Sequence, residues 1–161
     1  ISKIALGSKN PSVVVGMHFF NPPPLMELVE VVRGDKTSDW TVAAARAFAE
    51  RMGKTVIVVR DTPGFATSRL GVCLGAEAMR MLEQGVASAE DIDRAMELGY
   101  RHPVGPLKLT DVVGLDVRLA VLEHLHGELG EAFRPPEILR KKVAEGKLGK
   151  KSGEGFYKWN K

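Results

Sequence analysis

The stretch GMHFFNPPPLMELVEVV, residues 16–32, contains two apolar runs joined by a segment with three consecutive prolines. The first run ends in HFF and includes His18, and the second, LVEVV, carries Glu30 at its centre. Both runs are short and rich in β-branched and aromatic residues, so they predict two strands joined by a stiff turn. On this pattern alone, His18 can be a structural histidine at a strand end and Glu30 the exposed face of an edge strand, as well as a functional pair.

A third strand and a helix follow the same pattern. The residues TVIVVRD (55–61) predict the third strand, and the run SVVVGMHFF extends the first strand over residues 12–20. The continuous apolar character of VIVV favours a strand covered on both faces, as in an α/β sheet. Between the second and third strands, the residues from Ser38 to Gly53 predict a helix. Its N-cap is Ser38 or Asp39, its stop is Gly53, and its apolar positions are Val42, Ala45, Phe48 and Met52.

The rest of the chain predicts helices only. After DTPGF (61–65), the segments 88–99 and 135–146 each have a typical helix start and a glycine at the end. Two longer apolar segments, residues 69–82 and 107–129, have enough apolar residues to bury a broad face. Cys73 lies within the first of these segments, where a buried apolar role is expected.

Composition limits the class of protein. The chain has 161 residues, of which 44% are hydrophobic, and this is enough for one ordinary domain or two small ones. The formal charge of +3 is mild, and basic residues are not interleaved with aromatic ones, so a nucleic acid is not the expected partner. The single cysteine excludes an internal disulfide and a thiolate metal cluster. We expect a soluble, cytoplasmic protein that has no metal site and no membrane segment. Its mild positive charge fits a phosphorylated small ligand.

Four blocks together resemble the L-3-hydroxyacyl-CoA dehydrogenase family. They are GMHFFNPPPLMELVEVV, DTPGFATSRL, HPVGPLKLTDVVGLD and PPEILRKKVAEGKLGKKSGEGFY, in that order. The resemblance implies that residues 1–60 are the C-terminal part of a Rossmann-type, NAD-binding α/β domain. It also implies that residues 61–161 form an all-α domain like that of 6-phosphogluconate dehydrogenase, which binds substrate and dimerises. The strand–GxGxxG–helix unit of the NAD site is absent from the sequence, so we expect this chain to be the C-terminal half of the enzyme, inactive alone.

The resemblance also assigns roles to single residues. His18 corresponds to the general base that takes the substrate hydroxyl proton, and Glu30 to the carboxylate that orients it. Asn21 corresponds to an asparagine that contacts the nicotinamide part of NAD, and Lys151 to a lysine that reaches the cofactor. Ser68 stands where the family normally has asparagine, a ligand of the substrate's 3-oxygen or thioester carbonyl. Its hydroxyl is shorter than an amide and has fewer donors.

The function implied is NAD-dependent oxidation of 3-hydroxyacyl-CoA to 3-oxoacyl-CoA, as in fatty acid metabolism and β-oxidation, by a homodimer. One alternative is a non-catalytic oligomerisation or acyl-CoA-binding module that has lost the cofactor domain. Another is a related sugar-acid dehydrogenase, which shares the spacing of His, Asn-Pro and Glu. That group does not usually have the HFFNP aromatic pair or the KxGxGFY ending.

Overall fold

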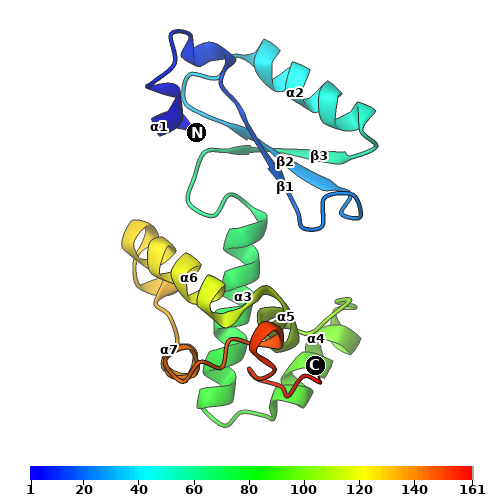
Figure 1. The fold of residues 1–161 in the computed structure, drawn as a ribbon, viewed down its shortest axis with the longest axis vertical. Helices are drawn as coiled ribbons and strands as arrows, with labels where there is room; N and C mark the ends of the chain where they lie inside the picture. The colour runs from blue at the N-terminus through cyan, green and yellow to red at the C-terminus, as the bar shows by residue number, and fades with distance from the viewer. Residues whose placement is uncertain (161) are drawn as a thin grey trace. The chain divides into compact units, whose positions relative to one another are not determined.

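The computed structural model describes residues 1–160, which form two compact units (Figure 1). The first unit spans Ile1–Ala66 and contains every strand assigned among the described residues. The second unit begins at Thr67 and is helical. The chain thus consists of a small α/β unit and a larger all-α unit, and each unit has its own cluster of buried apolar side chains.

The first unit is a three-stranded sheet in the order β1-β2-β3. Strand β1 (Gly16–Phe19) pairs antiparallel with β2 (Leu28–Arg33), which pairs in parallel with β3 (Thr55–Arg60). The parallel pair requires a crossover, and α2 (Asp39–Arg51) supplies it and lies against the sheet (Figure 1). Two short turns of helix, α1 (Ser2–Ala5) and η1 (Pro11–Val13), precede the sheet.

The strand that is buried on both faces is β2 and not β3. Val29 and Val31 on one face and Glu30 on the other are all 0% exposed, whereas Val58 on β3 is 45% exposed. The expectation of a doubly covered third strand was therefore wrong for the described residues, which leave side chains of β3 such as Val58 uncovered. The first strand is also shorter than expected, since residues 11–13 form the 3₁₀ turn η1.

Helix α2 has the predicted ends but a different buried face. The Ser38 side chain accepts a hydrogen bond from the Thr41 backbone N–H, and Gly53 has a φ of 72° just beyond the last turn. Of the four apolar positions at helical spacing, Phe48 and Met52 are exposed. The side chains that the helix buries are smaller: Thr41, Ala45 and Ala49. Small residues allow the helix to approach the sheet closely, and the large apolar side chains point away from it.

The second unit contains five helices among the described residues, together with the short 3₁₀ turns η2 (Glu131–Phe133) and η3 (Lys150–Ser152). The apolar segment 107–129 divides at Gly114, whose φ of 106° ends one helix and begins the next. Cys73 is exposed, contrary to expectation, because it lies on the outer side of its helix. The helices are α3 (Thr67–Glu83), α4 (Ala89–Gly99), α5 (Pro106–Val113), α6 (Leu115–Leu129) and α7 (Glu137–Ala144).

Two buried carboxylates hold the C-terminal segment of this unit. Asp93 on α4 accepts hydrogen bonds from the backbone N–H groups of Leu107 and Lys108 and from the Tyr157 hydroxyl. Burial and this bond to Asp93 raise the pKa of the Tyr157 hydroxyl, which therefore stays protonated. Asp111 on α5 is 0% exposed and accepts three hydrogen bonds, from the backbone N–H groups of Phe156 and Tyr157 and from the Trp159 indole.

The Asp111 contacts predict a large loss of stability on truncation. The Asp111→Ala substitution leaves three donors unpaired, and bonds to a charged acceptor of this kind contribute about 1.5–3 kcal/mol each when considered singly. We expect the free energy of unfolding of the second unit to fall by at least about 3 kcal/mol. Urea unfolding followed by Trp159 fluorescence measures it. The control is Glu128→Ala, which removes an exposed carboxylate of α6, and equal unfolding midpoints for the two variants would contradict the prediction.

Candidate active site

His18 and Glu30 form a hydrogen-bonded pair across the sheet. They are directly opposite each other in the antiparallel register of β1 and β2, and His18 Nδ1 lies 2.7 Å from Glu30 Oε2. The Glu30 carboxylate is fully buried, whereas the His18 side chain is 34% exposed. With Glu30 ionised, its oxygens only accept hydrogen bonds, and in that state Nδ1 carries the proton and donates. His18 Nε2 has no hydrogen-bond partner among residues 1–160, and as the unprotonated nitrogen it can accept a proton.

A loop at the end of the first unit holds the second oxygen of Glu30. The backbone N–H of Ala66 donates to Glu30 Oε1 at 3.1 Å. The chain reaches this position through two left-handed residues, Gly64 at φ 75° and Phe65 at φ 47°. Positive φ is uncommon for a residue with a Cβ, so the backbone here is held by its surroundings. The Glu30 carboxylate is therefore fixed from two sides, by the neighbouring strand and by this loop.

Two aromatic rings pack against the imidazole of His18. The Phe20 ring is centred 4.7 Å away and the Phe65 ring 5.7 Å away, both tilted by more than 50° to the imidazole plane. Such tilted contacts restrict rotation of the ring about its last torsion. Phe20 belongs to the HFF run, but the contact made by Phe65 was not predicted, because Phe65 lies 47 residues after His18 and no local signal relates the two. The imidazole is thus held between the two rings, with Nδ1 toward Glu30.

The proline turn is fastened by a lysine that the sequence did not single out. Lys54 Nζ donates to the carbonyl oxygens of Pro23 and Met26 at 2.7 and 2.8 Å. Asn21 stands at the start of this turn, in a cis peptide bond with Pro22, and its side chain is exposed. Its amide makes no hydrogen bond with any residue that the structure describes, so it is available to a ligand on the same unit as His18.

The other two predicted site residues belong to the second unit, on different elements. Ser68 is in the first turn of α3, half-buried, and its hydroxyl has no hydrogen-bond partner in the described part of the chain. Lys151 in η3 forms an ion pair with Asp116 at 2.6 Å. The hydrogen bond from Lys151 lowers the pKa of the Asp116 carboxyl, so the pair is charged at neutral pH. Lys151 is thus already engaged by a carboxylate within its own unit.

The residues present fit one end of a dinucleotide. The free Asn21 amide and the exposed edge of His18 can face a nicotinamide ring, whereas no helix among residues 1–160 begins with the glycine loop that holds a pyrophosphate. The described residues contain no group of three or more histidine, cysteine, aspartate or glutamate side chains that could hold a metal ion. No helix in this part of the chain is both long and apolar enough to cross a bilayer.

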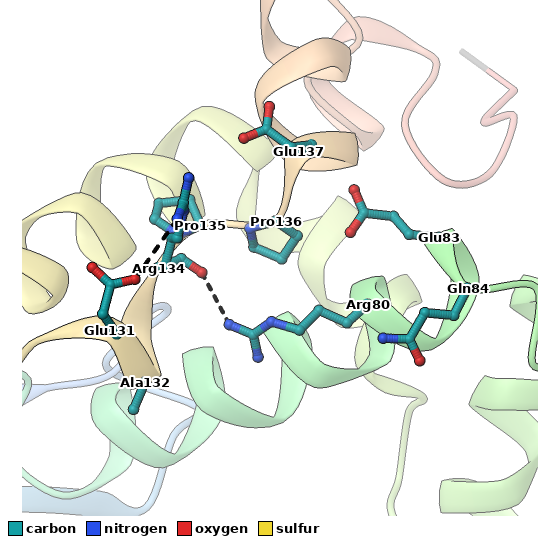
Figure 2. Close-up of a pocket in the computed structure, with 9 residues that line it drawn as sticks. All are labelled: Arg80, Glu83, Gln84, Glu131, Ala132, Arg134, Pro135, Pro136 and Glu137. Atoms are coloured by element: carbon teal, nitrogen blue, oxygen red, sulfur yellow. Dashed lines mark hydrogen bonds and ion pairs between the residues drawn. The ribbon is translucent and has the colours of Figure 1, made fainter.

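An open pocket of about 460 Å³ in the second unit is a weaker candidate (Figure 2). Four of its charged side chains are engaged with one another or with the backbone: Arg80 donates to the Arg134 carbonyl oxygen, Arg134 pairs with Glu131, and Glu83 accepts from the Ile138 N–H. No histidine or nucleophile lines it. The lining residues are Arg80, Glu83, Gln84, Glu131, Ala132, Arg134, Pro135, Pro136 and Glu137.

Two family descriptions match consecutive parts of the chain. Residues 1–62 match "3-hydroxyacyl-CoA dehydrogenase, NAD binding domain", and residues 64–159 match "3-hydroxyacyl-CoA dehydrogenase, C-terminal domain". The first match indicates NAD as the cofactor of the domain to which the sheet belongs. The two matches meet at residues 62–64, close to the observed division between Ala66 and Thr67.

Similar proteins cover the whole of this chain but are longer. A probable 3-hydroxybutyryl-CoA dehydrogenase of Deinococcus radiodurans is 49% identical over 160 residues, which are 99% of this chain and 58% of the relative. One of Bacillus subtilis is 49% identical over 98% of this chain and 55% of its own length. The crystal structure of (S)-3-hydroxybutyryl-CoA dehydrogenase PaaH1 from Ralstonia eutropha has a TM-score of 0.96 at 45% identity, covering 100% of this chain and 57% of that one. The chain therefore spans little more than half the length of these relatives.

Proposed function

The chain belongs to the 3-hydroxyacyl-CoA dehydrogenase family, and we propose that it is the C-terminal half of an NAD-dependent L-3-hydroxyacyl-CoA dehydrogenase. The observation that carries this proposal is the buried Glu30 carboxylate bonded to His18 Nδ1 at 2.7 Å. This arrangement leaves Nε2 as a proton acceptor, which oxidation of a hydroxyl group requires. A non-catalytic binding module has no use for a fully buried carboxylate aimed at a half-exposed histidine.

The chain's own residues supply the acid–base part of the reaction. His18 Nε2 takes the proton of the substrate's 3-hydroxyl group, and the Glu30 carboxylate stabilises the imidazolium that forms. When bound, NAD supplies the acceptor for the hydride that leaves C3. Asn21 and Lys151 contact the cofactor, and the Ser68 hydroxyl donates a hydrogen bond to the 3-oxygen or the thioester carbonyl of the substrate. For Lys151 this role requires it to share or exchange its bond with Asp116.

The two units divide the work in this proposal. Residues 1–60 are the end of the NAD-binding domain, and residues 61–161 form the helical domain for acyl-CoA and for dimerisation. Turnover requires a glycine-loop half in addition to these residues, because they hold no cradle for the cofactor pyrophosphate. Exposed apolar side chains on α3, α5 and α6 support a homodimer through this domain. They are Leu70, Val112, Val113 and Val117, which are between 41% and 71% exposed.

The related sugar-acid dehydrogenases remain the second candidate, because His18, Asn21 and Glu30 have the spacing that both groups share. The Phe20 contact with His18 favours the acyl-CoA enzyme, since it comes from the aromatic pair that the sugar-acid group usually lacks. Oxidation of a short 3-hydroxyacyl-CoA, compared with that of a free hydroxy acid, separates the two groups.

The role of His18 predicts a selective loss of turnover. In the full-length enzyme, His18→Gln removes the proton acceptor and should lower kcat by about 10² to 10⁴ with little change in KM. Glu30→Gln should cost less, because an amide can still orient the ring. Steady-state NADH formation from a short 3-hydroxyacyl-CoA measures both effects. His124→Gln is the matched control, since His124 is exposed on α6 and has no partner among the described residues. Wild-type turnover in the His18 variant would place the base elsewhere.

Ser68 stands where the family normally has asparagine, and this difference predicts that restoring asparagine raises the catalytic efficiency. A serine hydroxyl ends nearer the backbone than an asparagine amide, so its bond to the substrate oxygen is longer or mediated by water. Ser68→Asn should raise kcat/KM by about threefold to tenfold, which corresponds to one neutral hydrogen bond. The same assay measures it, with circular dichroism as the check on folding. An unchanged kcat/KM in a folded variant would mean that residue 68 does not touch the substrate.

A further inference from the structure

Arg118 is a buried cation without a partner. It lies in the first turn of α6 and is 8% exposed. No carboxylate, carbonyl or hydroxyl oxygen of residues 1–160 accepts a hydrogen bond from its guanidinium, and its Nε is fully sealed and unpaired. Burial lowers the pKa of this guanidinium, but arginine keeps its charge in proteins. An unpaired buried charge is costly, and a group from outside these residues that paired with it would remove that cost.

The outer edge of the guanidinium remains open to a ligand. Nε is buried and unpaired, whereas the two terminal nitrogens, which also have no hydrogen-bond partner among residues 1–160, are not fully buried. Nearby acidic groups are already engaged, since Asp116 on the same helix pairs with Lys151. A planar guanidinium whose two terminal nitrogens are free matches the two oxygens of a carboxylate.

The position of Arg118 relates it to the proposed substrate site. Its Nη1 lies 3.5 Å from the point where a Cβ on Gly71 would stand, so the guanidinium lies over bare backbone of α3. Gly71 is three residues after Ser68, which puts both on one face of α3, about 4.5 Å apart along the helix axis. A ligand with an oxygen at Ser68 therefore needs only a short chain to bring a second group to Arg118.

We propose that Arg118 binds a carboxylate at the far end of a short acyl chain, so that the enzyme favours 3-hydroxyacyl-CoA substrates that are half-thioesters of dicarboxylic acids. The proposal rests on the proposed function, in which Ser68 binds the substrate oxygen. The phosphates of coenzyme A do not fit this place, because the long pantetheine arm separates them from the thioester. Arg118 is then a specificity-determining residue, and it adds a second anchor to a substrate held at Ser68.

The test compares two ligands that differ only in the terminal group, adipyl-CoA and hexanoyl-CoA. Isothermal titration of the full-length enzyme should give tighter binding of adipyl-CoA. Arg118→Met should weaken the binding of adipyl-CoA by at least about thirtyfold, the usual effect of removing one partner of a buried charge pair. The affinity for hexanoyl-CoA should stay nearly unchanged. Arg94→Met is the matched control, because it removes an arginine that is 68% exposed on α4. It should affect neither ligand.

The outcomes separate this inference from the proposed function. If both ligands bind equally well to the wild type, the inference is overturned and the proposed function stands. If Arg118→Met weakens the binding of both ligands alike, the anion that pairs with Arg118 is a coenzyme A phosphate. If the substitution changes the sedimentation coefficient and not the selectivity between the ligands, that anion is a carboxylate of a second subunit. Both results overturn the inference. If neither acyl-CoA binds, the proposed function fails and the inference fails with it. The wild-type comparison decides the matter even if the Arg118 variant does not fold.

Discussion

The hydrogen bond between His18 Nδ1 and Glu30 depends on the register of two strands. Side chains alternate across a strand, so a shift of one residue between β1 and β2 would send Glu30 to the opposite face and leave His18 without its partner. The register is held from the turn, where Lys54 bonds two of its carbonyl oxygens, and from the buried valines that flank Glu30. The Ala66 N–H then binds the other oxygen. The pairing of His18 with Glu30 therefore follows from the geometry of the sheet, and the contacts of the surrounding residues hold the pair in place.

The second unit uses buried charge in two different ways. Asp93 and Asp111 are buried and fully paired, and they fasten the C-terminal segment to α4 and α5. Arg118 is buried and has no hydrogen-bond partner among residues 1–160. A paired buried carboxylate specifies the fold, because any rearrangement leaves donors and acceptors unsatisfied. A buried cation without a partner among the described residues makes no such contribution to the fold, and this contrast is the reason for proposing that Arg118 binds a ligand.

Local signals in the sequence predicted those features that depend on neighbouring residues. The cap at Ser38 and the stop at Gly53 are such features, since each acts within one turn of its helix. The burial of Thr41 and Ala49 and the exposure of Phe48 and Met52 were not predicted, because they depend on how closely α2 approaches the sheet. The pairing of Asp111 with residues 156–159 spans more than 40 residues and has no local signal. The roles of Ser68, Asn21 and Lys151 remain predictions drawn from the family pattern.

The tautomer of His18 tests the central claim most directly, because it reports the bond to Glu30 without requiring substrate or cofactor. Long-range proton–nitrogen correlation spectra of the ¹⁵N-labelled chain, recorded where the imidazole is neutral, distinguish the protonated ring nitrogen from the unprotonated one. The account predicts that His18 carries its proton on Nδ1 and that Glu30→Gln weakens this preference. A neutral His18 with its proton on Nε2 would contradict the account, since that nitrogen could then not accept the proton of a substrate hydroxyl group.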